Sequence, residues 1–389
     1  MKKIAITHTD FRIYWPARLK ALEEELTRHG VELYVIEIAG KGSPYAFAGR
    51  DEQPTKRWTT IFPDKEMEDL ASSEIKEQLI SLFEKINPDV IAAGAIAFPS
   101  GAIAAMWAKK HRKSIVIFDD AKLEDVPRGR VTNFIKKSIY RNIDSVMYPA
   151  PTWDQTGFSW GFKKEQIFYG VDVVDNSFWQ IPSEEKTARK NTIVCVGRQI
   201  ERKNMEFLIR AFQKSNAADY ELLLVGDGVE NSKLRSLAKE DSNIKFYPFL
   251  TQNEIRTLYK RVSALVIPSK FETWGLIINE AMAAGLPVLA SDKCSAAEIL
   301  VKNGKNGYIF SPNNMDSLIN ALNTFFSLTP EQQVVMGEES EKIISEWGLN
   351  TFAKEMFNAA NYAYQHKKEC KSITDKIILS LWKGRYRQA

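Results

Sequence analysis

Short runs of β-branched and other apolar residues alternate with amphipathic segments along the whole chain. Such runs, without polar alternation, are typical of strands that are buried on both faces of a parallel sheet. The amphipathic segments between them have the length of crossover helices. The sequence therefore predicts an α/β protein. The expected strands are 3–7, 32–36, 89–92, 114–118, 145–148 and 166–169, and then 192–196, 221–225, 244–246, 264–268 and 287–290.

The chain length and one polar stretch predict how these elements divide into domains. A chain of 389 residues has room for two or three domains. Residues 176–191 contain Pro182 and many charged side chains, so they can bury little and are expected to form a hinge near Ser183. We predict two doubly wound, Rossmann-like domains, 1–182 and 183–362, whose carboxyl edges face a ligand-binding cleft. Residues 363–389 would form a helix and tail that returns to the first domain or meets a membrane surface.

Charge and cysteine content narrow the classes of function. Lys and Arg number 53 against 49 Asp and Glu, and a net charge of +4 is too small for a dedicated nucleic-acid binder. The three cysteines form no C-x-x-C pair, and the N-terminus runs into a strand without a signal-peptide core, so a cytoplasmic location is expected. Residues 90–108 are uncharged, but Pro99-Ser100-Gly101 interrupts them, which favours strand, loop and helix over a membrane span.

Two basic, aromatic segments could contact a membrane. The tail 376–387 places Trp382 and Tyr386 among four cations, which suits a helix at the surface of an anionic bilayer. The alternative is a last helix packed on a domain. Residues 128–141 have a similar character, and a solvated basic helix face is the other interpretation there. A peripheral position at the inner face of the plasma membrane is therefore a hypothesis.

The segment 268–287 carries the most chemical information. A buried strand ends in a loop that holds Glu272, then Gly275 allows close approach of a ligand, and a helix follows whose free N–H groups can bind a phosphate. Glu280 lies eight residues after Glu272, about one turn inside the helix. The two carboxylates could therefore contact opposite ends of one elongated ligand.

With its flanking residues, this segment resembles the retaining, nucleotide-sugar-dependent glycosyltransferases of family four, which have the GT-B fold. The E-x₇-E spacing of Glu272 and Glu280 encloses Trp274-Gly275-Leu276, and Ala281-Met282-Ala283-Ala284-Gly285 follows it directly. Gly197-Arg198 followed by Lys203 and Asn204 is similar to the G-R-x-x-x-x-K-G motif of the family, with Asn in place of the last Gly. Gly226-Asp227-Gly228 is similar to its G-D-G loop, and Gly170-Val171-Asp172 to its G-V-D segment.

The resemblance implies a role for each matching residue. Arg198 and Lys203, near Gly197, would neutralise the leaving diphosphate, and two fixed cations there would make a metal unnecessary. No D-x-D sequence occurs, and the four histidines lack ligand spacing. Glu272 would bind the transferred sugar, and Glu280 the ribose hydroxyls. The amides of Trp274, Gly275 and Leu276 would hold the distal phosphate. Around the nucleobase the resemblance places Gly226, Asp227, Gly228, Tyr247 and Phe249.

The first domain departs from the family. Where the family has a glycine-rich loop after the first strand, this chain has His8, Asp10 and Arg12. Where the family has a histidine that contacts the donor sugar, this chain has Asp119-Asp120. A carboxylate also accepts hydrogen bonds from sugar hydroxyls, so both aspartates are candidate catalytic residues. A cap on a helix that opens at Ala121 is the structural alternative for one of them.

Together these features predict a metal-independent, retaining hexosyltransferase. It would move a sugar from a nucleoside diphosphate sugar, a UDP-sugar first among them, to a saccharide or lipid-linked saccharide, as in cell-envelope or polysaccharide biosynthesis. No cofactor other than this co-substrate, and no nucleic-acid partner, is expected. The alternatives are a nucleotide-sugar epimerase or phosphorylase of the same fold, or a non-catalytic protein that binds nucleotide sugars.

Overall fold

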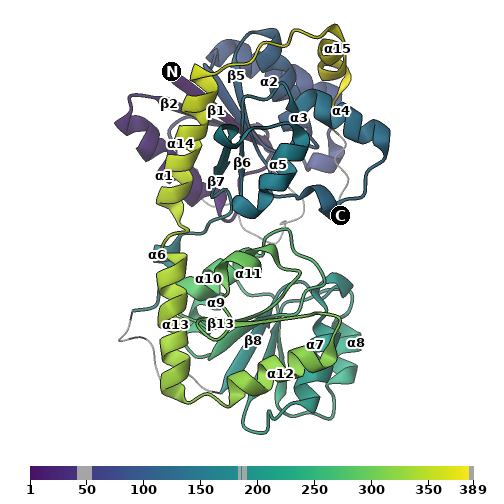
Figure 1. Cartoon of the computed structure of the whole chain (residues 1–389), viewed down its shortest axis with the longest axis vertical. Helices are drawn as coiled ribbons and strands as arrows, with labels where there is room; N and C mark the ends of the chain where they lie inside the picture. Colours follow the sequence, from purple (N-terminus) through teal and green to yellow (C-terminus); the bar gives the residue numbers. More distant parts are fainter. Residues whose placement is uncertain (42–54, 183–184, 186–190, 385–389) are drawn as a thin grey trace. The chain divides into compact units, whose positions relative to one another are not determined.

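The structure is a computed structural model that describes residues 1–41, 55–182, 185 and 191–384. The chain forms two compact units (Figure 1). The first unit consists of residues 1–173 together with 349–389, and the second of residues 174–348. Each unit is built on one parallel sheet, which confirms the predicted α/β class with two Rossmann-like domains.

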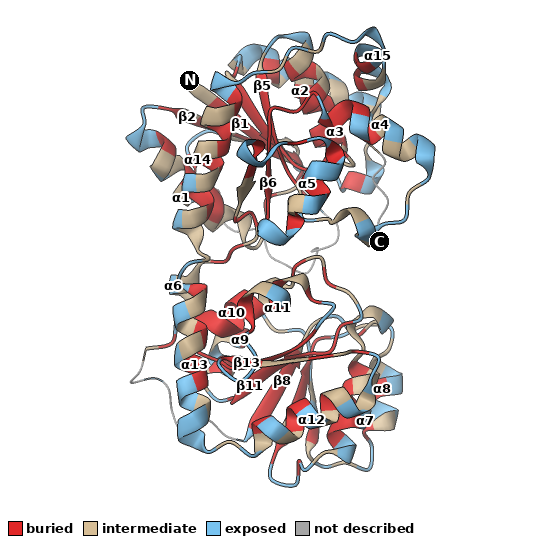
Figure 2. Cartoon of the chain, in the orientation of Figure 1, coloured by how far each residue is buried: buried red, intermediate tan, exposed pale blue. Residues whose placement is uncertain are grey.

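The first unit has a seven-stranded sheet of order β3-β2-β1-β4-β5-β6-β7. All its neighbouring strands pair in parallel. The strands are β1 (Lys3–His8), β2 (Glu32–Ala39), β3 (Trp58–Phe62), β4 (Val90–Ala93), β5 (Ser114–Phe118), β6 (Ser145–Tyr148) and β7 (Ile167–Tyr169). The four central strands β1, β4, β5 and β6 are almost entirely buried, as continuous apolar runs require (Figure 2).

Helices cover both faces of this sheet (Figure 1). They are α1 (Trp15–Arg28), α2 (Ser72–Ile86), α3 (Pro99–Lys110), α4 (Arg130–Tyr140), α5 (Asp154–Trp160), α14 (Leu349–Gln365) and α15 (Ile373–Leu381). The long helix α14 packs against α1 and against β5, β6 and β7, where its residues Phe352, Met356 and Ala360 are fully buried. The C-terminal helix α15 packs against α3 and α4.

The second unit has a six-stranded parallel sheet of order β10-β9-β8-β11-β12-β13. Its strands are β8 (Thr192–Val196), β9 (Glu221–Val225), β10 (Ile244–Tyr247), β11 (Ala264–Ile267), β12 (Val288–Ser291) and β13 (Gly307–Phe310). Its helices are α6 (Asn176–Trp179), α7 (Met205–Lys214), α8 (Asn231–Leu237), α9 (Gln252–Tyr259), α10 (Leu276–Ala283), α11 (Ser295–Leu300), α12 (Met315–Phe326) and α13 (Pro330–Ile344). A core between α7, α8, α12 and one sheet face includes Leu208, Leu222 and Leu322, each fully buried.

The units divide at other residues than the sequence suggested. Residue 183, the expected boundary, lies outside the described residues. The second unit begins at Val174, because α6 packs against α10 and Asn176 donates hydrogen bonds to the carbonyls of Ile344 and Trp347. It ends at Gly348, so α14 belongs to the first unit, although the sequence assigned residues up to 362 to the second domain.

The uncharged stretch 90–108 forms strand β4, a loop and helix α3, as expected. Pro99 is the first residue of α3, where a missing N–H costs no hydrogen bond. Among the helices described, none combines the length and apolar character needed to cross a membrane.

Candidate functional site

The loops that follow β8, β9, β10 and β11 leave the same edge of the second sheet, because these strands are parallel neighbours. This carboxyl edge is where doubly wound sheets bind ligands. Most of the residues that the sequence singled out lie on these four loops or on helix α10. Tyr247 is the last residue of β10, and Asp119 and Asp120 belong to the first unit.

After β8 the chain turns through Gly197 and a short 3₁₀ helix, Glu201–Lys203. Asn204 then adopts a left-handed conformation with φ of 56°. Asparagine tolerates this region better than most residues, which explains how it stands where the family motif has glycine. Its side-chain amide also donates hydrogen bonds to the carbonyls of Pro268 and Pro312, both at 3.1 Å. Asn204 therefore fixes the end of the cationic segment against the loop after β11.

The two candidate cations have different surroundings. The Nζ atom of Lys203 lies 2.5 Å from Oε1 of Glu272, and Ser269 donates a hydrogen bond to the same oxygen at 2.7 Å. The side chains of Lys203 and Glu272 are 20% and 12% exposed, so the ion pair is largely shielded from water. Arg198 is exposed, and its guanidinium has no partner among the residues that the structure describes.

Glu272 is also held through its backbone. Its N–H donates to the carbonyl of Lys293, and its own carbonyl accepts from the N–H of Ser295. These bonds connect the loop after β11 to the loop after β12. A carboxylate fixed in this way positions the ammonium group of Lys203 at the edge of the sheet.

The Gly226-Asp227-Gly228 loop needs its glycines because two loops approach closely. A Cβ atom on Gly226 would lie 2.1 Å from the carbonyl oxygen of Gly197, and one on Gly228 would lie 2.4 Å from that of Gln199. No side chain fits at these distances. The side chain of Asp227 is exposed and accepts a hydrogen bond from the N–H of Gly228 at 2.7 Å.

Gln199 is a residue of this site that the sequence analysis missed. It is fully buried, and its side chain donates to the carbonyl of Gly226 and accepts from the amide of Asn231, both at 2.8 Å. Its backbone N–H donates to the carbonyl of Asp227 at 2.8 Å. Gln199 thus joins the loop after β8 to the loop after β9. The only sequence signal was its position inside the G-R-x-x-x-x-K segment, because a glutamine usually lies on the surface.

Helix α10 begins after Gly275, whose φ of 104° favours glycine. The indole of Trp274 is buried and donates to Oδ1 of Asn279 at 2.9 Å, while its carbonyl accepts from the N–H of Ala296. Within the described part of the chain, the N–H groups of Gly275 and Leu276 donate no hydrogen bond. Two such groups at the positive end of a helix can bind an anion.

Glu280 lies inside α10 and is only 2% exposed. Burial, and to a lesser extent the charge of Glu280, hold the pKa of Tyr259 well above its usual range. This places the carboxylate close to the carboxyl end of α9, within the second unit.

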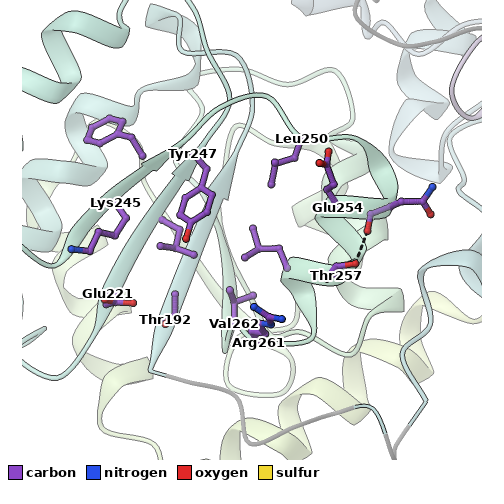
Figure 3. A pocket seen from close by; sticks show the side chains of 13 residues that line it. Thr192, Glu221, Lys245, Tyr247, Leu250, Glu254, Thr257, Arg261 and Val262 are labelled. Carbon is purple, nitrogen blue, oxygen red and sulfur yellow. Dashed lines mark hydrogen bonds between the residues drawn. The ribbon is translucent and has the colours of Figure 1, made fainter.

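Two aromatic residues at the end of β10 and just beyond it, Tyr247 and Phe249, are partly exposed. Tyr247 is 42% exposed and Phe249 46%. The carbonyl of Tyr247 accepts from the N–H of Gly226 at 3.1 Å, which brings the end of β10 beside the glycine loop. Tyr247 also lines a groove of about 740 Å³ between the sheet and α9, together with Lys245, Glu254 and Arg261 (Figure 3). Phe249 does not line this groove.

In the first unit, the carboxylate of Asp119 closes a local turn. It accepts hydrogen bonds from the N–H of Ala121 at 3.0 Å and from the hydroxyl of Tyr140 at 3.1 Å. Burial raises its pKa. Asp120 is exposed, and its carbonyl accepts from the indole of Trp153. No helix opens at Ala121, so the capping alternative takes the form of a turn.

Comparison with known proteins relates the second unit to a family of glycosyltransferases. Residues 177–343, nearly all of the second unit, match the model of the glycosyl transferases group 1. The second unit is therefore similar to a group 1 glycosyl transferase domain. This confirms the family resemblance seen in the sequence.

Individual relatives and one solved structure show how much of the chain is similar to known proteins. An uncharacterized glycosyltransferase of Haemophilus influenzae is 32% identical over 171 residues, which are 40% of this chain and 47% of that protein. A sulfoquinovosyl transferase of Arabidopsis thaliana is 27% identical over 325 residues, 76% of this chain and 62% of the relative. The chain thus spans about half to three-fifths of the length of these relatives. The structure of Anabaena HepE in complex with UDP-glucose superposes with a TM-score of 0.69 at 18% identity, covering 92% of this chain and 98% of HepE, which confirms the GT-B fold.

Proposed function

We propose that this protein moves a sugar from a nucleoside diphosphate sugar to a hydroxyl acceptor with retention of the anomeric configuration. The observation that carries the proposal is the convergence, at one sheet edge, of Arg198, the Lys203–Glu272 pair and the unbonded N–H groups at the start of α10. Cations and helix N–H groups together form a site for a diphosphate.

In the proposed reaction, the bond between the anomeric carbon and the β-phosphate oxygen breaks as the acceptor oxygen bonds to that carbon from the same side. The proton of the acceptor hydroxyl passes to the departing phosphate oxygen, which leaves a nucleoside diphosphate. Arg198 and Lys203 stabilise the negative charge that develops on this oxygen. Their charges are fixed, so the reaction needs no metal ion.

Further contacts follow from the same placement. The amides of Gly275 and Leu276, with that of Trp274, bind the distal phosphate, and Glu280 accepts from the ribose hydroxyls. Glu272 orients both Lys203 and the transferred sugar. Gly226, Asp227, Gly228, Tyr247 and Phe249 surround the base. This assignment is supported by the fold that the chain shares with HepE, which has been solved with UDP-glucose.

A UDP-sugar as donor and a saccharide or lipid-linked saccharide as acceptor are part of this proposal. So is a place of action in the cytoplasm, at the inner face of the plasma membrane. Asp119 and Asp120 are proposed to act on the sugar or acceptor side. The chain spans only part of the length of its relatives, so the donor, the acceptor, the location and the roles of the two aspartates are to be tested by experiments on this protein.

The test begins with thermal shifts of the full chain with UDP-, GDP-, ADP- and CDP-sugars. A ligand at 100 times its Kd should raise the unfolding free energy by about 2.7 kcal/mol. Transfer by Arg198→Ala and Lys203→Ala is then measured with the stabilising donor and a panel of saccharide acceptors, with Lys239→Ala, an exposed lysine on the same unit, as control.

We expect turnover to fall at least about 100-fold in the first two variants and to stay unchanged in the control. Activity should persist in excess EDTA. Native turnover in both cation variants would refute their role, and metal-reversible inactivation would refute metal independence. Donor conversion without an acceptor would favour an epimerase. Binding without any turnover would favour a non-catalytic protein.

A further inference from the structure

Helix α15 packs on the first unit with a charged residue on its buried side and apolar residues on its outer side. Its buried side presents Asp375, which is 3% exposed, together with Leu379. Ile373, Ile377 and Leu381, spaced four residues apart, lie on its outer side and are 75%, 52% and 71% exposed. A helix at the surface of a water-soluble domain normally has the opposite arrangement, with its apolar stripe inside. Folding of the chain alone therefore does not account for this outer face.

Specific bonds hold α15 in this orientation. The carboxylate of Asp375 accepts from the guanidinium of Arg141 at 2.9 Å and from the amide of Asn142 at 3.0 Å, both just after α4. Beyond the helix, the indole of Trp382 donates to the carbonyl of Ile96 at 2.7 Å. Trp382, which the sequence placed at a membrane interface, thus helps to anchor the tail. The outward direction of the isoleucines is fixed by these contacts.

The neighbouring helix α4 also exposes apolar side chains. Val131 and Phe134 are 73% and 56% exposed, and Val126, shortly before the helix, is 50% exposed. Since α15 packs against α4, the two helices present their apolar residues on adjoining elements of the first unit (Figure 1). We name this the α4–α15 face; it consists of Val126, Val131, Phe134, Ile373, Ile377 and Leu381.

The two segments that carry the α4–α15 face are rich in positive charge. Residues 126–141 contain five cations and no acid, although the whole chain has a net charge of only +4. Residues 371–384 add three lysines, and their one acid is the buried Asp375. The exposed cations are Arg130, Lys137, Arg141, Lys371, Lys376 and Lys383. Two copies of such a face would repel each other, whereas anionic lipid headgroups would attract it.

We propose that the α4–α15 face docks on an anionic lipid bilayer, with α15 lying in the plane of the headgroups. Its isoleucines and leucine, with Phe134, enter the acyl boundary, and the surrounding lysines and arginines contact lipid phosphates. This surface belongs to the first unit, and none of its residues is among those assigned to sugar transfer. The proposal therefore does not depend on the transferase activity.

The test is sedimentation of the full chain with vesicles of phosphatidylcholine, with and without phosphatidylglycerol. The double variant Ile377→Gln with Leu381→Gln changes exposed side chains only. Its matched control is Val334→Gln with Val335→Gln, two exposed valines on α13 of the second unit. Circular dichroism and the unfolding midpoint of each variant show that it folds.

We expect the native chain and the control to bind vesicles that contain phosphatidylglycerol, and the α15 variant to bind at least about tenfold more weakly. Added salt should weaken native binding, because it screens the attraction to headgroups. Equal binding by the α15 variant, or no binding by the native chain, would overturn the proposal. A dimer in light scattering that the α15 variant abolishes, without vesicle binding, would instead assign the face to a second copy.

Discussion

Gln199 offers the sharpest test of how the proposed donor site is held together. The substitution Gln199→Ala removes a buried side chain that joins two loops. The carbonyl of Gly226 would lose a buried partner, at a cost of about 1–3 kcal/mol. The amide of Asn231 is only partly buried and can turn to water, so its loss costs about 0.5–1.5 kcal/mol. The local stability of the glycine loop should therefore fall by about 1.5–4.5 kcal/mol.

Hydrogen exchange measured by mass spectrometry reports this local stability directly. The amides of residues 226–231 should exchange at least about tenfold faster in Gln199→Ala, since 1.4 kcal/mol corresponds to a factor of ten. The affinity for the stabilising nucleotide sugar should fall with it. Gln213→Ala is the control, because Gln213 is exposed and makes one long hydrogen bond of 3.4 Å. Exchange within twofold of the native rate would refute the bridging role of Gln199.

Two further predictions concern the first unit. His8 is packed against four aromatic rings, and burial lowers its pKa from 6.5 to about 4, so between these values the unfolded chain binds the proton more readily. As the pH falls from about 6.5 to about 4, the free energy of unfolding should therefore decrease, by up to about 1.4 kcal/mol per pH unit. In urea unfolding, His8→Gln should lose less of this free energy on acidification than the native chain. Identical dependence on pH in the two proteins would contradict the prediction. In Asp119→Asn, one carboxylate oxygen is replaced by an NH₂ group, which cannot accept the hydrogen bond from the Ala121 N–H or from the Tyr140 hydroxyl. The loss of this bond should destabilise the first unit by about 1–3 kcal/mol. Asp120→Asn should change stability by less than about 0.5 kcal/mol, so a loss of transfer in that variant alone would assign the sugar contact to Asp120.

The strands that are buried on both faces could be read from the sequence. Runs such as 114–118 and 192–196 match β5 and β8, because a strand in the middle of a parallel sheet has to be apolar on both sides. Two edge strands were missed. Strand β3, with the sequence Trp-Thr-Thr-Ile-Phe, has one neighbour and no buried residue, and the short β13 has one neighbour and two partly exposed residues. Neither is therefore the continuous buried run that marks a central strand.

The unit boundaries were harder to predict, since they depend on where a helix packs. Residues 349–365 have a helical apolar stripe in the sequence, and that stripe fits any complementary surface. Only the contacts of α14 with α1 and β7 show that it belongs to the first unit.

The sequence by itself determined the fold class, the family resemblance and the segments that form the candidate site, because all three are recorded in local patterns of apolar residues, glycines and charges. Tertiary structure alone decided which side chains meet. Lys203 and Glu272 are 69 residues apart, and they form an ion pair because β8 and β11 are neighbours in the sheet. The outward direction of Ile377 on α15 was decided in the same way, by the bonds that draw Asp375 toward α4. A helical pattern fixes which residues share a face, but the surface on which the helix docks decides whether that face meets protein or solvent.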